Sequence, residues 1–397
     1  MSIIDVLIVL FYNIILYIYY VFIYICSFFN DKFSTWVRYQ NKWKKQKFEF
    51  AKYESSVWIH VASVGELRMA LPLIQTIKNE NPDVKIVVSF FSVSIFNFLH
   101  LFDDKIDSFF LFPKEYSNNI QFIIDRINPK CLILVKNERW LNLLRITHQN
   151  NIDIFLVESD KLDGKNMFYN MYIKYTNKYI KKIFFDYDNS LRLQSVIDNN
   201  IEHTEDNLVH TFCADAFTIV LGSCYIEEVE YVANIYKNNQ SAMKIILVPH
   251  EYNEHVLQQY QNYFDDRIGL YSKNEINGNL LMVDVYGNLK SIYQYADIAF
   301  VGGGFNGKLH NVFEPAVFGI PIIVGPKFRS EYHIQQAINL KLIDVVKTKE
   351  DLMNIIEYYK NNKKINFELK VKWNSFFNQS KSSSDIIWKE IKKDTIV

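Results

Sequence analysis

The sequence predicts an α/β protein with two Rossmann-like domains that face a cleft, preceded by one N-terminal membrane helix. Apolar runs alternate with amphipathic stretches up to Val157, and a second such series begins at Thr218. Parallel sheets covered by helices on both faces show this pattern, because their strands are buried on both sides. A long uncharged segment near the N-terminus predicts the membrane helix.

Each domain is predicted from its own series of strands. The first series is Val57–Val61, Lys85–Phe91, Cys131–Val135 and Ile154–Val157, and the second is Thr218–Gly222, Lys244–Pro249, Leu280–Val283, Ile298–Val301 and Pro321–Val324. The polar stretch Asp198–Asn207 leads into the boundary between them. We therefore expect a membrane anchor at 1–30, a basic juxtamembrane segment at 31–50, an N-terminal domain at 51–208, a C-terminal domain at 209–372 and a terminal helix at 373–397.

The N-terminal segment is long enough to cross a bilayer. Val6–Phe29 contains 24 residues without a charge, and at about 1.5 Å per residue such a helix spans a hydrocarbon core of roughly 30 Å. A cleaved signal peptide fits less well, because no basic region precedes the segment and no small-residue cleavage site follows it. An interfacial helix is the alternative. Basic residues follow the segment, which predicts a cytoplasmic body and contact with anionic lipid: Lys32, Arg38, Lys42, Lys44, Lys45, Lys47 and Lys52.

The composition excludes several classes of function. Lysine plus arginine and aspartate plus glutamate both number 44, so no global charge attracts nucleic acid. The four cysteines, Cys26, Cys131, Cys213 and Cys224, lack the spacing of a zinc site or a disulfide framework. We therefore expect a protein without a structural metal and without nucleic-acid partners.

A glycine-rich turn in the C-terminal half predicts a nucleotide site. The strand Ile298–Val301 leads into Gly302, Gly303 and Gly304, and Asn311 and Glu314 follow at a predicted helix start. Backbone without side chains approaches a phosphate closely, and a helix N-terminus favours an anion. The alternative is local, because Asn at an N-cap with Glu three residues later also forms a capping pair.

A second motif, Ser63-Val64-Gly65-Glu66, follows the strand Val57–Val61. Gly65 permits a sharp turn, and Glu66 opens an amphipathic helix. Ligands of open α/β sheets lie at the carboxyl ends of strands, so Glu66 is a candidate general base. The alternative is that its carboxylate only interacts favourably with the helix dipole.

Together these segments resemble the 3-deoxy-D-manno-octulosonic acid (Kdo) transferases, which build the inner core of lipopolysaccharide. The resemblance covers roughly residues 30–340. It extends to further motifs in the same order as in the family: Lys136, Glu138 and Trp140; Gly222-Ser223 followed by Glu227, Glu228 and Glu230; Pro249-His250-Glu251; and Asp284, Gly287, Leu289 and Tyr293.

The sequence also departs from the family pattern. Ser92–Ile95 lacks the usual final glycine, Asn288 replaces a common glutamate, and Cys224-Tyr225 replaces the usual threonine and its neighbour. Glu158–Leu162 contains no Asn-Ala-Arg, and Asp206–His210 lacks the usual basic residue. These differences affect the expected acceptor contacts more than the reaction type.

The resemblance implies a GT-B glycosyltransferase of the inner membrane, with catalytic domains in the cytoplasm and a C-terminal helix packed back on the N-terminal domain. It implies inverting transfer of Kdo from CMP-Kdo to the lipid A precursor (lipid IVA), without metal or cofactor, with Glu66 as the base. The implied donor-binding residues are Pro249, His250, Tyr286, Gly287, Gly302, Gly303, Gly304, Asn311 and Glu314. The acceptor candidates are Ser63, Gly65, Arg68, Lys136, Glu138 and Arg139, although basic residues are more often solvated surface.

Three other polar features have less specific explanations. His60 lies inside an apolar run, which favours a buried ring over a catalyst, whereas both interpretations stay open for His310. Asp186-Tyr187-Asp188 follows an apolar run as the metal-binding motif of GT-A enzymes does. A CMP donor has one phosphate, and we interpret that motif as a solvated turn.

Two rival functions remain open. One is another GT-B nucleotide-sugar enzyme, a UDP-sugar transferase or an epimerase, which shares the glycine turn but lacks the Ser-Val-Gly-Glu motif. The other is a non-catalytic, membrane-tethered relative that binds CMP. Glu66, Asn311 and Glu314 are all present, which favours the enzyme.

Overall fold

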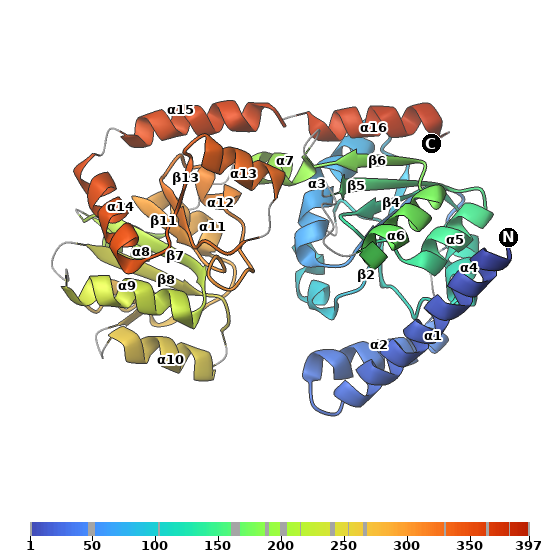
Figure 1. The fold of residues 1–397 in the computed structure, drawn as a ribbon, viewed down its shortest axis with the longest axis horizontal. Coiled ribbons are helices and arrows are strands. Elements are labelled where there is room, and N and C mark those ends of the chain that lie inside the picture. The colour runs from blue at the N-terminus through green and yellow to red at the C-terminus, as the bar shows by residue number, and fades with distance from the viewer. Residues whose placement is uncertain are drawn as a thin grey trace. The chain divides into compact units, whose positions relative to one another are not determined.

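The chain forms two compact units, each built around one parallel sheet (Figure 1). The structure, a computed structural model, describes residues 2–46, 52–101, 104–159, 167–186, 190–198, 205–214, 216–238, 243–252, 254–264, 268–328, 331–362, 365–380 and 382–395. Unit 1 comprises Met1–Ser195 and Ser382–Val397, and unit 2 comprises Val196–Lys381. The chain thus enters unit 2 at Val196 and leaves it after Lys381, whereas the sequence predicted these boundaries at 209 and 373.

The sheet of unit 1 has the strand order β3-β2-β1-β4-β5-β6, and all its pairs are parallel. The strands are β1 (Ser56–Val61), β2 (Lys85–Phe90), β3 (Ser108–Leu111), β4 (Pro129–Val135), β5 (Asp153–Ser159) and β6 (Lys182–Phe185). The order reverses between β1 and β4, and ligands of such sheets bind outside the carboxyl ends of the strands at this switch point. Glu66 follows β1, and Lys136, Glu138 and Arg139 follow β4.

Apolar side chains from both faces of this sheet form two buried clusters under helices. The central strands are mainly apolar, with Val57, Ile59 and Ile133 fully buried. The surrounding helices are α1 (Ile3–Cys26), α2 (Asp31–Gln46), α3 (Val64–Glu80), η1 (Val93–Leu101), α4 (Ser117–Ile127), α5 (Leu141–Gln149), α6 (Met167–Thr176), η2 (Asn177–Tyr179), α7 (Leu191–Asp198) and α16 (Ser383–Asp394).

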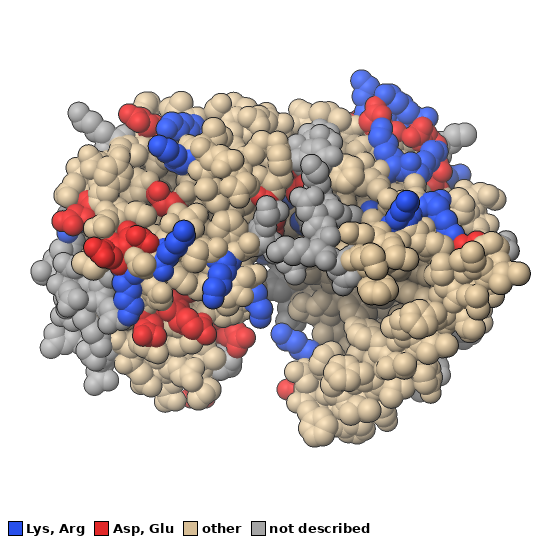
Figure 2. All heavy atoms as spheres, viewed as in Figure 1, with Lys and Arg blue, Asp and Glu red and all other residues tan. Residues whose placement is uncertain are grey.

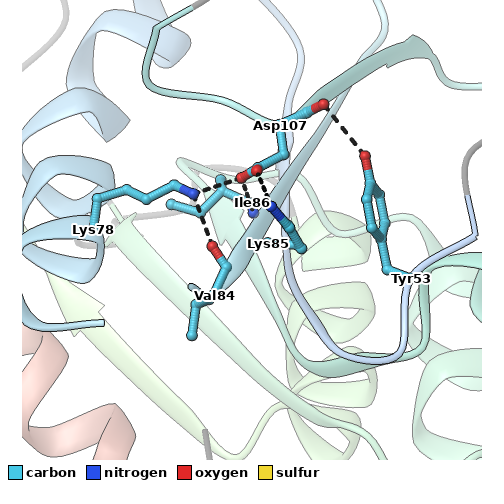
Figure 3. Close-up of polar contacts among 6 residues, drawn as sticks. All are labelled: Tyr53, Lys78, Val84, Lys85, Ile86 and Asp107. Atoms are coloured by element: carbon cyan, nitrogen blue, oxygen red, sulfur yellow. Dashed lines mark hydrogen bonds and ion pairs between the residues drawn. The ribbon is translucent and has the colours of Figure 1, made fainter. Parts of the chain in front are cut away.

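A polar cluster joins α3 to the strand ends opposite the switch point (Figure 3). Asp107 accepts hydrogen bonds from Lys78 Nζ at 2.6 Å, from Lys85 Nζ at 3.0 Å and from the Ile86 amide at 2.9 Å. Burial opposes ionisation of Asp107, but these bonds lower its pKa overall. The cluster is structural, since it satisfies the amide at the start of β2 and lies before β3.

The apolar N-terminal helix is packed along unit 1. α1 starts with a capping box between Ser2 and Asp5 and buries Leu16, Tyr20 and Ile23. In the part of the chain that the structure describes, α1 is the one helix that is long and apolar enough to cross a membrane. The basic segment 31–50 forms α2 as far as Gln46, with Lys32, Arg38 and Lys42 exposed, and residues 47–50 lie outside the described residues.

Unit 2 contains a sheet with the strand order β13-β12-β11-β7-β8-β10-β9, again parallel throughout. Its strands are β7 (Thr218–Cys224), β8 (Lys244–Pro249), β9 (Gly269–Leu270), β10 (Leu280–Met282), β11 (Ile298–Val301), β12 (Ile322–Val324) and β13 (Ile343–Val345). Its helices are α8 (Asn207–Cys213), α9 (Ile226–Asn238), α10 (Glu254–Phe264), η3 (Tyr271–Lys273), α11 (Leu289–Ile292), η4 (Tyr293–Tyr295), α12 (Phe313–Ala316), α13 (Tyr332–Asn339), α14 (Lys349–Asn361) and α15 (Ile365–Asn378).

The C-terminal region forms two helices that belong to different units. α15 stays in unit 2, where Trp373 and Phe376 contact the ring of Phe313. α16 packs on α3 in unit 1 and buries Ile387, Trp388 and Ile391. The predicted terminal helix at 373–397 is therefore divided, because the aromatic residues of α15 fill the core of unit 2.

Candidate functional site

Glu66 lies at the carboxyl end of β1, in the first turn of α3. Its Oε2 accepts a hydrogen bond from the Ala62 amide at 2.5 Å, so the carboxylate is held over the end of the strand. The Glu66 amide donates to Ser63 Oγ at 3.3 Å, which makes Ser63 the N-cap of α3. The carboxylate is thus held by the Ala62 amide, while the Ser63 cap holds the backbone of the same residue.

Burial, together with the nearby charge of Glu138, raises the pKa of Glu66 to about 7. The pKa of Glu138 is itself raised by burial, and its Oε2 accepts from Trp140 Nε1 at 2.5 Å. The opposite charge of Lys136 lowers the pKa of Glu66. The structure therefore brings Glu66, Glu138 and Lys136 together, and a carboxylate that titrates near neutral pH can act as a general base there.

The remaining acceptor candidates divide into exposed and buried residues. Gly65 and Arg68 are exposed on the first turns of α3. Arg139 is buried, with 5% of its surface exposed, and its Nη1 donates to Asn177 Oδ1 at 2.6 Å. Its carbonyl oxygen accepts from the Tyr172 hydroxyl. Arg139 therefore joins β4 to the end of α6, a contact that the sequence did not predict.

A buried carboxylate next to this region, Glu115, was not predicted from the sequence. Glu115 accepts hydrogen bonds from the Tyr12 hydroxyl at 2.7 Å, the Asn142 amide at 2.6 Å and the Leu143 amide at 3.1 Å. Burial raises the pKa of Glu115 to about 7 despite these bonds. A carboxylate three residues after the apolar run Phe109–Phe112 was the available signal.

A cavity of about 310 Å³ lies beside Glu115. It is lined from α1 by Tyr12, Leu16 and Tyr19, and from α6 by Tyr169 and Tyr172. Residues between these helices complete the lining, namely Phe91, Glu115, Asn137, Arg139 and Trp140. The cavity therefore adjoins the segment after β4 that carries Glu138.

In unit 2, the three glycines after β11 are required by contacts within the protein. A Cβ on Gly302 would lie 2.3 Å from the Ser223 carbonyl oxygen, and one on Gly304 would lie 2.4 Å from the Gly325 amide nitrogen. Gly303 has φ +86°, a conformation that residues with a Cβ rarely adopt. The strand ends of β7, β11 and β12 therefore approach closely at this turn.

Amides of the glycine turn are hydrogen-bonded to a buried glutamate. Glu228, with 1% of its surface exposed, accepts from the Phe305 amide at 3.3 Å through Oε1 and from the Tyr225 amide at 3.0 Å through Oε2. A bond from the Gly303 amide lowers its pKa, although burial raises it overall. Within the turn, the amides of Gly303 and Phe305 thus donate to an internal carboxylate, and the contact of this turn with a phosphate stays a prediction.

Asn311 and Glu314 contact each other beside a single helical turn. Asn311 Nδ2 donates to Glu314 Oε1 at 3.2 Å, and Asn311 Oδ1 accepts from the Phe313 amide at 3.1 Å. α12 has four residues and Val312 as its N-cap, not Asn311. The helix ends early because Gly319, at φ +73°, reverses the chain before Pro321. A helix of one turn contributes little macrodipole.

Three rings gather near this turn. The Tyr225 ring lies 4.3 Å from His250 and 5.7 Å from His310, and the two histidine rings are 4.6 Å apart. Burial, together with His250, lowers the pKa of His310 to about 4, so this ring is neutral at pH 7. Pro249 ends β8 next to His250.

The last two donor candidates lie on an exposed turn. Tyr286 has 68% of its surface exposed and meets the ring of Tyr252 edge-on at 5.5 Å. Gly287 has φ +109°, and a Cβ there would meet no atom within 4 Å. Gly287 is therefore explained by its backbone conformation alone.

His60 and the Asp186-Tyr187-Asp188 motif lie away from the glycine turn in sequence, and both belong to unit 1. His60 is a buried neutral ring, as predicted, with Nδ1 2.8 Å from Ser89 Oγ and a pKa lowered by burial to about 3. Asp186 is buried, so the predicted solvated turn is wrong for this residue, while Tyr187 and Asp188 lie outside the described residues. Among the residues described, no group of His, Cys, Asp and Glu is arranged to hold a metal ion.

Comparison with solved structures defines the class of fold. A glycosyltransferase from Rickettsia africae matches 87% of this chain and 99% of its own, with a TM-score of 0.60 and 11% identity. UDP-GlcNAc 2-epimerase from Neisseria meningitidis matches 85% and 100%, with a TM-score of 0.59 and 13% identity. The fold is that of the GT-B enzymes, as predicted.

Sequence comparison shows which enzymes this chain is similar to. The model of the family described as 3-deoxy-D-manno-octulosonic-acid transferase matches residues 38–184. The transferase of that name from Aquifex aeolicus is 28% identical over 69% of this chain and 76% of its own. The one from Chlamydia muridarum is 24% identical over 89% and 90%. This chain is thus similar in sequence to the Kdo transferases, which confirms the resemblance seen in its motifs.

Proposed function

We propose that this chain transfers Kdo from CMP-Kdo to a hydroxyl of the lipid A precursor, with inversion at the anomeric carbon. The relationship to the Kdo transferases supports the sugar that is transferred. The observation that carries the reaction is Glu66, held at the end of β1 with a pKa of about 7.

In this reaction Glu66 acts as the general base. Its carboxylate takes the proton of the acceptor hydroxyl while that oxygen attacks the anomeric carbon and the bond from that carbon to the CMP phosphate oxygen breaks. CMP leaves with the bonding electron pair as a phosphate monoester. A base whose pKa lies near the working pH accelerates such a step by about 10²–10⁴.

Unit 2 holds the donor in this proposal. The Asn311–Glu314 pair supplies oxygen and nitrogen atoms for ribose hydroxyls, and His250, Pro249 and the Tyr286-Gly287 turn line the nucleotide. Gly302, Gly303 and Gly304 shape the turn, while Glu228 holds its amides. We propose no metal and no cofactor for the step.

The proposed place of action is the cytoplasmic face of the inner membrane. α1 provides the attachment, and the exposed cations Lys32, Arg38 and Lys42 on α2 favour anionic lipid. Lys44, Lys45 and Lys47 were also predicted to contact anionic lipid. The side chains of Lys44 and Lys45 and the whole of Lys47 lie outside the described residues.

The test measures transfer and CMP binding separately. The purified full chain is incubated with CMP-Kdo and a tetra-acylated lipid A precursor, and the added sugars are counted by mass. We expect Glu66→Gln to retain CMP affinity and to lose transfer by about 10²-fold or more, and Glu314→Ala to weaken CMP binding. Glu54→Gln, at an exposed position, is the control. Full transfer by Glu66→Gln would rule out this base.

A further inference from the structure

The two faces of α1 have different partners. Tyr12, Leu16, Tyr20 and Ile23 repeat at helical spacing and face unit 1, where Leu16, Tyr20 and Ile23 are buried. The opposite stripe is apolar, and each of its members has at least half of its surface exposed: Leu7, Phe11, Ile14, Ile18, Phe22 and Ile25. The surface over most of α1 is formed by uncharged residues (Figure 2). An exposed apolar area of this extent marks a membrane or protein contact.

Polar contacts hold α1 to unit 1 along its length. Near its start, Asp5 accepts from the Tyr175 hydroxyl at 2.9 Å and pairs with Lys178. In the middle, Asn13 Oδ1 accepts from Asn142 Nδ2 at 2.7 Å. Farther along, the Tyr20 hydroxyl accepts from the Glu115 amide at 2.8 Å.

These contacts are incompatible with a helix that crosses the bilayer. From Asp5 to Tyr20 the helix rises about 22 Å, which is most of a hydrocarbon core of roughly 30 Å. A crossing helix would therefore carry Lys178, Glu115 and Asn142 into hydrocarbon, or lose every one of these bonds. A helix that lies in the plane of one leaflet keeps them and still buries its apolar stripe in lipid.

A second apolar surface adjoins α1. Met167, Phe168 and Met171 of α6 have 67%, 74% and 60% of their surfaces exposed. The same helix contacts α1 through Tyr172, whose ring stacks on Tyr12 at 6.3 Å, and through Tyr175. α6 therefore extends the apolar surface of α1 on unit 1.

The cavity beside Glu115 lies between these two helices. Its lining is mainly aromatic and aliphatic, and its volume of about 310 Å³ is at the lower end of the roughly 300–1,000 Å³ usual for small-ligand sites. Arg139, also in the lining, is nine-tenths buried, and its Nε has no hydrogen-bond partner among the described residues. A buried cation with a donor to spare in an apolar cavity favours a ligand with an anionic group and a hydrocarbon chain.

We propose that α1 and α6 lie in one leaflet, and that the cavity between them binds an acylated, anionic lipid from that leaflet, with Arg139 contacting its anionic group. The proposal rests on the proposed function only in that the sugar acceptor is such a lipid. The membrane placement and the lipid site stand on contacts within unit 1.

The first experiment asks on which side of the membrane the ends of α1 lie. Ser2→Cys and Asn30→Cys are made separately in the full chain, with Cys26 and Cys213 replaced by serine. Inverted inner-membrane vesicles are treated with a membrane-impermeant maleimide. We expect both cysteines to be labelled, because both ends lie on the cytoplasmic side. The opposite result is labelling of Asn30→Cys alone, with Ser2→Cys reacting only after detergent is added. It would mean that α1 crosses the bilayer and would overturn its placement in one leaflet.

The second experiment measures lipid binding without donor or turnover. The probe is a fluorescent lysophosphatidic acid, compared with a lysophosphatidylcholine of the same chain, and inorganic phosphate serves as competitor. We expect Arg139→Gln to bind the anionic probe at least tenfold more weakly, and Leu16→Trp, which fills the cavity, to weaken both probes. Lys174→Gln, an exposed cation on α6 outside the cavity lining, should bind normally.

The outcomes separate this site from the proposed reaction. Glu66→Gln should bind the probe as the unchanged chain does, even if it has lost transfer. Equal binding of the two probes, or displacement by inorganic phosphate alone, contradicts a lipid site with an anionic contact. Normal binding of the anionic probe by both Arg139→Gln and Leu16→Trp excludes the cavity as the lipid-binding site.

Discussion

At the scale of single residues, the pKa of Glu66 decides when the proposed base is active. The carboxylate is charged above its pKa of about 7 and protonated below it. Burial is the largest cause of the raised pKa, and the charge of Glu138 is the second. The fall of the transfer rate at low pH, the acid limb of the rate profile, therefore depends on both burial and the charge of Glu138.

We expect transfer to fall as the pH drops below about 7, because the base becomes protonated. Glu138→Gln removes the like charge, so the pKa of Glu66 should fall and the acid limb should move to lower pH. Burial remains, so the limb should stay above that of an exposed glutamate. The measurement is kcat/KM against pH with CMP-Kdo as donor. An unmoved limb in Glu138→Gln would show that Glu138 does not influence the base.

Glu228 illustrates a residue that joins a neighbouring amide to a turn distant in sequence. Glu228→Ala leaves the amides of Tyr225 and Phe305 without this acceptor, and each lost bond to a charged group costs about 1.5–3 kcal/mol. We expect a lower thermal midpoint and weaker CMP binding, read by calorimetry on the full chain. Glu227→Ala, at an exposed neighbouring position, is the matched control and should change neither.

At the scale of elements, α16 is a structural part of unit 1 although it ends the chain. The Thr76 hydroxyl of α3 donates to Ser384 Oγ at 2.9 Å, and Gln194 Nε2 donates to the same oxygen at 2.9 Å. Trp388 is fully buried against this core. The C-terminal segment therefore stabilises the domain that carries Glu66.

Trp388→Ala should destabilise unit 1 by about 3–5 kcal/mol, the usual cost of removing a buried large aromatic ring. Denaturant unfolding followed by proteolysis of unit 1 measures this change. Ile386→Ala, on the exposed face of the same helix, should cost little. Equal effects of the two substitutions would contradict the packing of α16.

At the scale of the whole molecule, α1 is a part of folded unit 1 in addition to being the proposed membrane attachment. A simple anchor can be removed without changing the stability of the body behind it. Here α1 contributes three buried side chains and the Tyr12 bond to Glu115.

Deletion of residues 2–27 should therefore lower the thermal midpoint of unit 1, since each lost buried side chain contributes about 1.5–3 kcal/mol. The measurement compares the deleted and full chains in the same detergent. Leu7→Ala with Phe11→Ala, on the exposed stripe, is the control and should keep the midpoint while weakening vesicle binding. An unchanged midpoint after the deletion would show that α1 is dispensable for folding.

Local sequence patterns were sufficient to predict the strands that carry the residues of the proposed reaction. β1, β4, β7, β8 and β11 consist mainly of apolar residues, and burial on both faces of a parallel sheet leaves such a run in the sequence. The turn after β1 also places Glu66 by short-range bonds, so its position at a strand end follows from neighbouring residues. The apolar length of α1 is visible in the same way.

Long-range packing was needed for the rest. The contacts of Glu115 with α1, of Glu228 with the glycine turn and of Arg139 with α6 join residues far apart in the chain. A single sequence records hydropathy and local backbone preference but not which distant polar groups meet. For this reason α1 looked like an isolated span, although its tyrosines and Asn13 find their partners only in the folded unit.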